Sequence, residues 1–155
     1  MPLKFEDLKI LQASETISDD LWNEVYQWDP FARDVVGKQI TRAADSIGAN
    51  IAEAYGRFHF GEKVQFLYYS RGSLFETKYW LNRIKERHHL EENLVRNYSS
   101  KLSELARQLN KFISDLKTQQ RNIRTNEKTL SEDSGKFNSN QQNGSSSTLF
   151  EEEDL

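Results

Sequence analysis

The chain has no cysteine and only two prolines among its 155 residues. Without cysteine, disulfides and thiolate metal sites are excluded. No run approaches the roughly 18 consecutive apolar residues that a membrane-spanning helix needs. The first ten residues, MPLKFEDLKI, contain no apolar stretch followed by a small-residue cleavage site. We therefore expect no secretory signal and a cytoplasmic protein of bacterial type.

Patterns typical of catalysis are also scarce. There is no glycine-rich phosphate loop and no H-E-x-x-H pair, and the three histidines are His59, His88 and His89. Adjacent histidines on a helix point in different directions, so we expect no metal. Glu53 and Glu76 can pair across two helices, as carboxylates do in di-iron bundles. The Glu-x-x-His motifs that complete such a site are missing, so we expect the two glutamates to face arginines instead. No Ser, Thr or Lys sits in a recognisable setting for activation. We therefore predict that the protein is not an enzyme and needs no cofactor.

Apolar residues recur at helical spacing in four segments, and no strand-like alternation competes with them. Asp29-Pro30 separates the first two, because a residue before proline is pushed out of the α region. Short connections make sequential helices antiparallel, which predicts an all-α, up-down-up-down four-helix bundle over residues 1–117. The four expected helices cover residues 5–28, 31–57, 64–84 and 91–116.

From Thr118 on, serine, asparagine, glutamine, threonine and charged residues dominate. Such a segment cannot bury enough apolar surface to offset its chain entropy. We therefore expect residues 118–155 to form a disordered polar and acidic tail. Its end, Glu151 to Leu155 behind Leu149-Phe150, is either a solvating tail or a docking segment for a partner.

The net charge of −3 is unevenly distributed. Residues 71–117 hold ten Lys and Arg against six Asp and Glu, whereas residues 1–70 hold seven against eleven. A basic block of this kind favours an anionic partner such as nucleic acid, although a solvated helix face is the plainer interpretation. The candidate phosphate contacts are Arg83, Lys85, Arg87, Arg96, Lys101, Arg107 and Lys111.

The third helix carries more large apolar side chains than one core requires. A helix that buries a single stripe needs an apolar band only about 100° wide. Several aromatic residues fall outside that band, which indicates self-assembly or a docking surface. The expected core face comprises Val64, Leu67, Arg71, Leu74, Lys78 and Leu81, with Tyr68 and Phe75 beside it, whereas Phe66, Tyr69, Tyr79 and Trp80 point elsewhere.

Two outward stripes are candidates for an oligomer interface. Gly72 in a helix interior costs about 1 kcal/mol relative to alanine, and close approach of another helix would explain it. The stripe on the second helix is either a salt-bridged surface or a polar seam against a neighbouring subunit or an anionic ligand. The residues are Arg42, Ser46, Asn50, Glu53 and Arg57 on the second helix and Tyr69, Gly72, Ser73, Glu76 and Trp80 on the third.

The second helix also carries a resemblance to a known family. Its run from Gln39 to Arg57, QITRAADSIGANIAEAYGR, resembles the signature of the four-helix-bundle proteins of the 23S rRNA intervening-sequence family, also labelled S23 ribosomal proteins. The resemblance covers about residues 3–117. Gly48 stands where the family often has a proline, and Ala54 where it often has a glycine, so a kink at Gly48 is plausible and close packing at Ala54 is less certain. Further blocks in the same order are FEDL at 5–8, QFLY at 65–68, RGSL at 71–74 and Glu76.

The resemblance implies a homopentameric ring of four-helix bundles, found in bacteria and without known catalytic activity. It also implies a relation to the accessory subunits of diversity-generating retroelements, which bind a reverse transcriptase and nucleic acid. The resulting hypothesis is a non-enzymatic, ring-forming adaptor that binds structured RNA or an RNA–DNA intermediate, with a reverse transcriptase as a candidate partner. The alternative is a structural or protein-docking oligomer that binds no nucleic acid.

Overall fold

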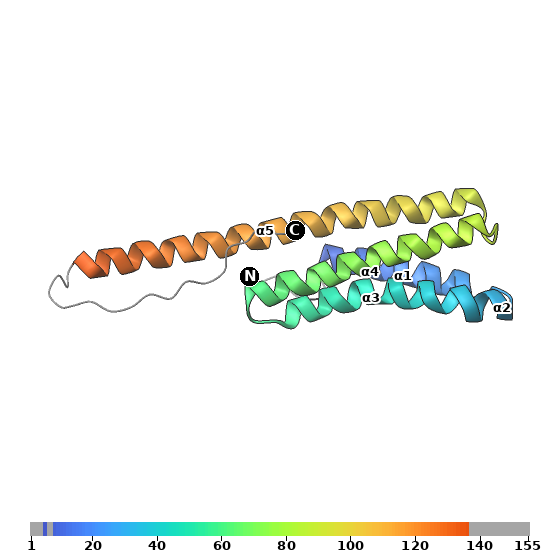
Figure 1. The fold of residues 1–155 in the computed structure, drawn as a ribbon, viewed down its shortest axis with the longest axis horizontal. Coiled ribbons are helices and arrows are strands. Elements are labelled where there is room, and N and C mark those ends of the chain that lie inside the picture. Colours follow the sequence, from blue (N-terminus) through green and yellow to red (C-terminus); the bar gives the residue numbers. More distant parts are fainter. Residues whose placement is uncertain (1–4, 6–7, 137–155) are drawn as a thin grey trace. The chain divides into compact units, whose positions relative to one another are not determined.

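Helices account for every regular element that this computed structural model describes, in residue 5 and residues 8–136. In chain order they are α1 (Lys9–Tyr26), α2 (Pro30–Ala32), the π-helical segment η2 (Arg33–Gly37), α3 (Lys38–Gly56), α4 (Phe60–Glu86) and α5 (Glu92–Lys136). Because α2, η2 and α3 follow one another without a break, they form one rod, and residues 8–120 make a bundle of four rods (Figure 1). The predicted all-α four-helix bundle is confirmed. None of the described helices is long and apolar enough to cross a bilayer.

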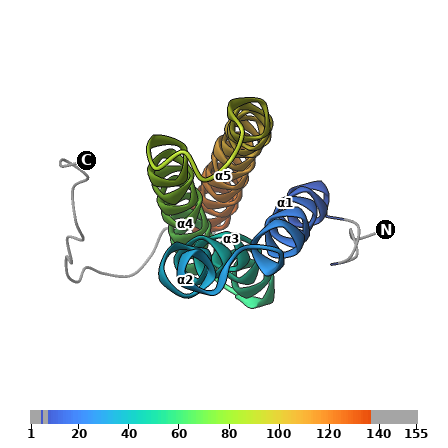
Figure 2. The same ribbon diagram turned by 90° about the vertical axis from the view of Figure 1, so that its right-hand side faces the viewer.

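The α3 rod lies between α1 and α4 and packs most closely against both (Figure 2). Its inner face carries small residues that allow this approach: Ala43, Ala44 and Ala54 are buried. A Cβ atom placed on Gly48 would lie 3.0 Å from the Ser14 hydroxyl of α1. The core that these rods enclose includes Leu21, Ile40, Ile47, Ile51, Leu67, Leu74, Ile84, Leu102, Leu105 and Leu109, all fully buried.

The core face of α4 differs from the predicted one at two positions. Ser70 and Thr77 are fully buried, whereas Arg71 and Lys78 lie at the edge of the core, half-buried. The hydroxyl of Ser70 donates a hydrogen bond of 2.8 Å to the carbonyl of Ile47 on α3, so its burial leaves no unmet polar group. A small hydroxyl side chain fits where two helices approach closely. The prediction was wrong because only apolar or long side chains were considered for the core face, and Ser70 and Thr77 are neither.

Local chemistry explains where the rods begin and end. The carboxylate of Asp29 accepts a hydrogen bond from the backbone N–H of Ala32 (3.1 Å), and Pro30 occupies the first helical position, where its missing N–H does no harm. After α4, His88 adopts φ 52°, and the N–H groups of His88 and His89 return to the carbonyls of Lys85 and Ile84. This is a Schellman ending, in which a residue in the left-handed region ends the helix.

The second rod is irregular, but at a different place from the one that the sequence indicated. The α-helix α3 runs through Gly48 without interruption, and the π-helical turns lie earlier, at Arg33–Gly37. A Cβ atom on Gly37 would lie 2.7 Å from Cγ1 of Val25, so the end of α1 packs directly on this glycine. Ala54 is buried, so close packing is retained there.

The end of the last helix was predicted wrongly. We expected it near Leu116, with a disordered segment from Thr118, but α5 continues to Lys136. Residues 118–132 are almost entirely exposed, so the argument against core burial was right. However, extending an existing helix needs no new nucleus, and this stretch is rich in good helix formers and has no proline. Residues 137–155, including the acidic end, lie outside the described residues, and residues 121–136 belong to a separate structural unit.

Tyr98 on α5 makes the stability of the bundle depend on pH. Its hydroxyl donates to the backbone carbonyl of Asp20 on α1 (3.3 Å). Burial, aided by the nearby carboxylates of Glu24 and Asp20, raises the pKa of Tyr98 to about 12. Between pH ~10 and ~12 the unfolded chain loses this proton and the folded chain keeps it, so the stabilisation is complete below pH ~10 and lost as pH approaches 12.

We therefore expect Tyr98→Phe to remove part of the alkaline sensitivity. The wild-type free energy of unfolding should fall by about 2 kcal/mol more than that of the variant between pH ~9 and ~12. Urea unfolding at a series of pH values measures this difference. Curves for the two proteins that stay parallel across this range would show that Tyr98 does not cause the effect.

Candidate interaction surfaces

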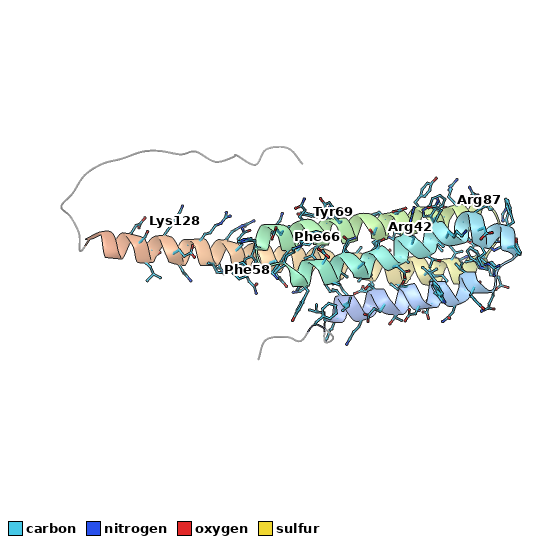
Figure 3. All side chains as sticks on the ribbon, turned by 90° about the horizontal axis from the view of Figure 1, so that it is seen from below. Arg42, Phe58, Phe66, Tyr69, Arg87 and Lys128 are labelled. Carbon is cyan, nitrogen blue, oxygen red and sulfur yellow. The ribbon has the colours of Figure 1, made fainter. Side chains whose placement is uncertain are left out.

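The two predicted interface stripes lie on neighbouring rods. We call them together the α3–α4 outer face: Arg42, Ser46, Asn50, Glu53 and Arg57 on α3, and Tyr69, Gly72, Ser73, Glu76 and Trp80 on α4. The guanidinium of Arg57 lies 4.6 Å from the ring centre of Phe66, which links the two rods. Tyr69 is half exposed. Figure 3 shows Arg42 on α3 and Phe66 and Tyr69 on α4.

The polar groups of the α3 stripe are satisfied by their own helix. Ser46 donates to the carbonyl of Arg42 (2.8 Å), Asn50 donates to the carbonyl of Ser46 (2.8 Å), and Arg57 is ion-paired with Glu53. The stripe is therefore already ordered in a single subunit, and a partner would not have to supply hydrogen bonds that are otherwise missing.

The expected arginine partners are present for only one of the two carboxylates. Glu53 pairs with Arg57, as predicted, whereas Glu76 accepts a hydrogen bond from the indole N–H of Trp80 (3.4 Å), so the prediction for Glu76 was wrong. In the described residues, no group of three or more His, Asp or Glu side chains is placed to hold a metal ion.

Gly72 faces open space. No atom of another part of the described chain lies within 4 Å of a Cβ atom placed there. The close helix neighbour that would explain this glycine is therefore absent from the subunit itself, and an approach by a second copy stays a prediction.

A groove between α1 and α3, which the sequence analysis missed, lies beside this face. It consists of two adjoining cavities of about 450 and 280 Å³, both lined by Asp45 and Ala49. Trp22 and Tyr26 of α1 line the larger one and are 57% and 70% exposed. The available signal was the spacing of small or short side chains along α3, at Asp45, Gly48, Ala49 and Ala52. We call this region the α1–α3 groove.

The seven candidate phosphate contacts differ in whether their charge is already compensated. Four form ion pairs with carboxylates of their own or a neighbouring helix: Arg96 with Glu92 (3.0 Å), Lys101 with Asp20 (3.3 Å), Arg107 with Glu104 (2.6 Å) and Lys111 with Asp115 (2.9 Å). The other three, Arg83, Lys85 and Arg87, have no carboxylate within 4 Å in the described part of the chain. The basic block thus carries less free charge than its composition suggests.

The shifted carboxyl pKa values belong to these surface pairs. Hydrogen bonding and charge from Arg96 lower the pKa of Glu92, and those from Arg107 lower the pKa of Glu104. Both carboxylates are exposed and belong to salt bridges along α5. Neither shift marks a catalytic cleft.

Comparison with known proteins gives a family match and a structural match. A family model described as 23S rRNA-intervening sequence protein matches residues 6–111. The fold is similar to a crystal structure of a protein of unknown function from the S23 ribosomal protein family of Bacteroides thetaiotaomicron VPI-5482, with a TM-score of 0.64 and 23% sequence identity. That match covers 68% of this chain and 95% of the other. No curated protein matches the chain.

Proposed function

Because the chain belongs to the 23S rRNA-intervening sequence protein family, we propose that it is a cytoplasmic, non-enzymatic adaptor that forms a homopentameric ring and binds nucleic acid. The observation that carries the proposal is the amount of large apolar surface left uncovered in one subunit. Trp22, Tyr26 and Tyr69 are each at least half exposed. Such patches mark sites of interaction with other molecules.

The two surfaces described above suit a contact of the head-to-tail type. On the α3–α4 outer face Tyr69 is half exposed and Trp80 is partly buried. The α1–α3 groove is hollow and lined in part by apolar and small residues, and its larger cavity borders the outer face at Arg42 and Ser46, which belong to both surfaces. A contact between unlike faces of identical subunits generates a closed ring when the rotation closes. In the proposed ring, Tyr69 and Trp80 of each subunit pack on the groove of the next.

Nucleic acid is the proposed ligand of the basic side of the bundle. Arg83, Lys85 and Arg87 gather at the end of α4 without ion-pair partners. The exposed ion pairs at Arg96, Lys101, Arg107 and Lys111 contribute little to stability, and in the proposed complex these cations bind phosphate instead. These contacts fix position without reading sequence, and a ring repeats them around its axis. A reverse transcriptase that handles the same nucleic acid is the proposed protein partner.

Filter binding of structured RNA and of an RNA–DNA hybrid across a salt series tests this function. We expect binding at about 50 mM salt that weakens steeply by about 200 mM, because each phosphate contact releases counterions. Absence of binding to either nucleic acid at the lowest salt would exclude the nucleic-acid part of the proposal.

A second candidate is a structural or protein-docking oligomer. It is favoured by the ion pairing of four of the seven candidate phosphate contacts. This candidate predicts a stable ring that binds none of the nucleic acids tested. The same filter-binding assay, combined with particle mass, therefore separates the two functions.

A further inference from the structure

A row of cation–aromatic pairs runs along α4, and three of its members, Tyr68, Arg71 and Lys78, contact α5. Arg71 lies 5.0 Å from the ring centre of Tyr68, Lys78 lies 5.8 Å from that of Phe75, and Arg83 lies 5.9 Å from that of Tyr79. Lys117 of α5 lies 5.3 Å from the ring of Tyr68. We call these four cations and three aromatic residues the α4–α5 ridge.

The cations of the ridge are held by neutral partners. Arg71 donates to the side-chain carbonyl of Asn110 (3.1 Å), and Lys78 donates to the hydroxyl of Ser103 (2.8 Å), both on α5. In the described part of the chain, none of the four cations is ion-paired with a carboxylate. The ridge therefore presents positive charge that the protein does not neutralise, unlike the paired arginines and lysines elsewhere on α5.

The aromatic rings of the ridge are available to a ligand. Phe75 is 56% exposed and Tyr79 is 54% exposed, although each is large and apolar. The positions 75 and 79 are one helical turn apart, so the two rings lie on the same side of α4, about 6 Å apart along its axis. An apolar ring held beside an uncompensated cation suits a ligand that offers both a flat apolar face and a negative charge.

Single-stranded nucleic acid has these two properties at every residue. Its bases stack on aromatic side chains, and its phosphates bind lysine and arginine. A duplex offers the same phosphates, but its bases are already stacked and cannot reach the rings. The ridge from Tyr68 to Arg83 is about 22 Å long, enough for several nucleotides.

We propose that the α4–α5 ridge is a binding site for single-stranded nucleic acid, in which Phe75 and Tyr79 stack on bases and Arg71, Lys78, Arg83 and Lys117 bind phosphates. The inference rests on the proposed nucleic-acid function and specifies its ligand class. It adds Arg71, Lys78, Lys117 and the two rings to the earlier candidates, with Arg83 common to both sets.

Fluorescence anisotropy with labelled oligonucleotides of about ten residues tests the site. The full chain is titrated with single-stranded RNA, single-stranded DNA and a duplex of the same length. We expect either single strand, or both, to bind at least 10-fold more tightly than the duplex. Four phosphate contacts predict a slope of log affinity against log salt of about −3, which is about a 50-fold loss between ~50 and ~200 mM salt.

Matched variants locate the binding. Phe75→Ala and Tyr79→Ala should each weaken single-strand binding about 5- to 100-fold, and Lys78→Gln should reduce the salt slope by about 0.7. The controls are Phe58→Ala, an 87% exposed ring outside the ridge, and Lys9→Gln, an exposed lysine on α1 that belongs to neither set of candidate phosphate contacts. Both controls should retain wild-type affinity, and circular dichroism checks that each variant stays helical.

Three results would overturn the inference. Equal affinity for duplex and single strands, with no effect of the ring variants, would remove the stacking site and leave the proposed function intact. A changed particle mass of Phe75→Ala and Tyr79→Ala with unchanged nucleic-acid affinity would assign the ridge to a subunit contact. A failure of every nucleic acid to bind at low salt would remove the proposed function together with this site.

Discussion

Replacing Leu74 by alanine should lower the free energy of unfolding of the bundle by about 2–5 kcal/mol. Leu74 is completely buried in the middle of α4. The substitution removes its apolar contacts and leaves a cavity that the surrounding rods can only partly close. Because domains of this size are stable by only about 5–15 kcal/mol, the variant should unfold at a clearly lower urea concentration.

The neighbouring residue provides the control. Phe75 is 56% exposed, so Phe75→Ala should change the free energy of unfolding by no more than about 0.5 kcal/mol. Urea denaturation followed by circular dichroism measures both variants under the same conditions. A large loss for Phe75→Ala together with a small loss for Leu74→Ala would mean that α4 is rotated relative to the face described above.

The second large effect concerns assembly. If the proposed ring forms, Gly72→Leu should reduce it to single subunits that remain helical. The position is exposed and faces open space, so the leucine has nothing to clash with in its own subunit, while it blocks the approach of a second helix. Trp80→Ala should have a similar effect by removing an aromatic contact, but Trp80 also packs partly on the core, so some loss of stability is expected as well. Light scattering measures the particle mass. An unchanged mass for both variants would show that the subunit interface lies on another surface.

A mixing experiment tests the head-to-tail arrangement itself. Ala49→Glu places a charge in the α1–α3 groove, where Ala49 lines both cavities, and Asn97→Glu adds the same charge to an exposed site on α5 as a control. Subunits with Gly72→Leu keep an intact groove, and subunits with Ala49→Glu keep an intact outer face. A mixture of the two should form pairs through the one intact contact and no ring. Restoration of the full ring in the mixture would contradict the proposed arrangement of the two faces.

Much of the fold follows from periodicity in the sequence. The steps of three and four residues through Ile40, Ile47 and Ile51 identify the buried face of α3, because a helix places such positions on one side. The same reasoning failed at Arg71 and Lys78, since small polar residues at positions 70 and 77 fill the tightest part of the contact instead. Periodicity reports where apolar residues gather and gives no measure of how closely two backbones approach.

The interaction surfaces were less accessible to sequence reasoning. The α1–α3 groove depends on the close contact of Gly48 with Ser14, which are far apart along the chain. The neutral partners of Arg71 and Lys78 come from α5, and the pairing of Lys101 with Asp20 joins α5 to α1. Counting charges along the chain therefore identified a basic block but not which of its charges are free. Helix continuation beyond Leu116 was missed because composition was taken as a sign of disorder, although an existing helix can extend through polar residues.

Sedimentation equilibrium of the purified chain at micromolar concentration shows whether further copies cover the apolar surface that one bundle leaves exposed. We expect a closed assembly of about 91 kDa, five times the 18.2 kDa of one chain. A single species at the mass of one chain would contradict this expectation.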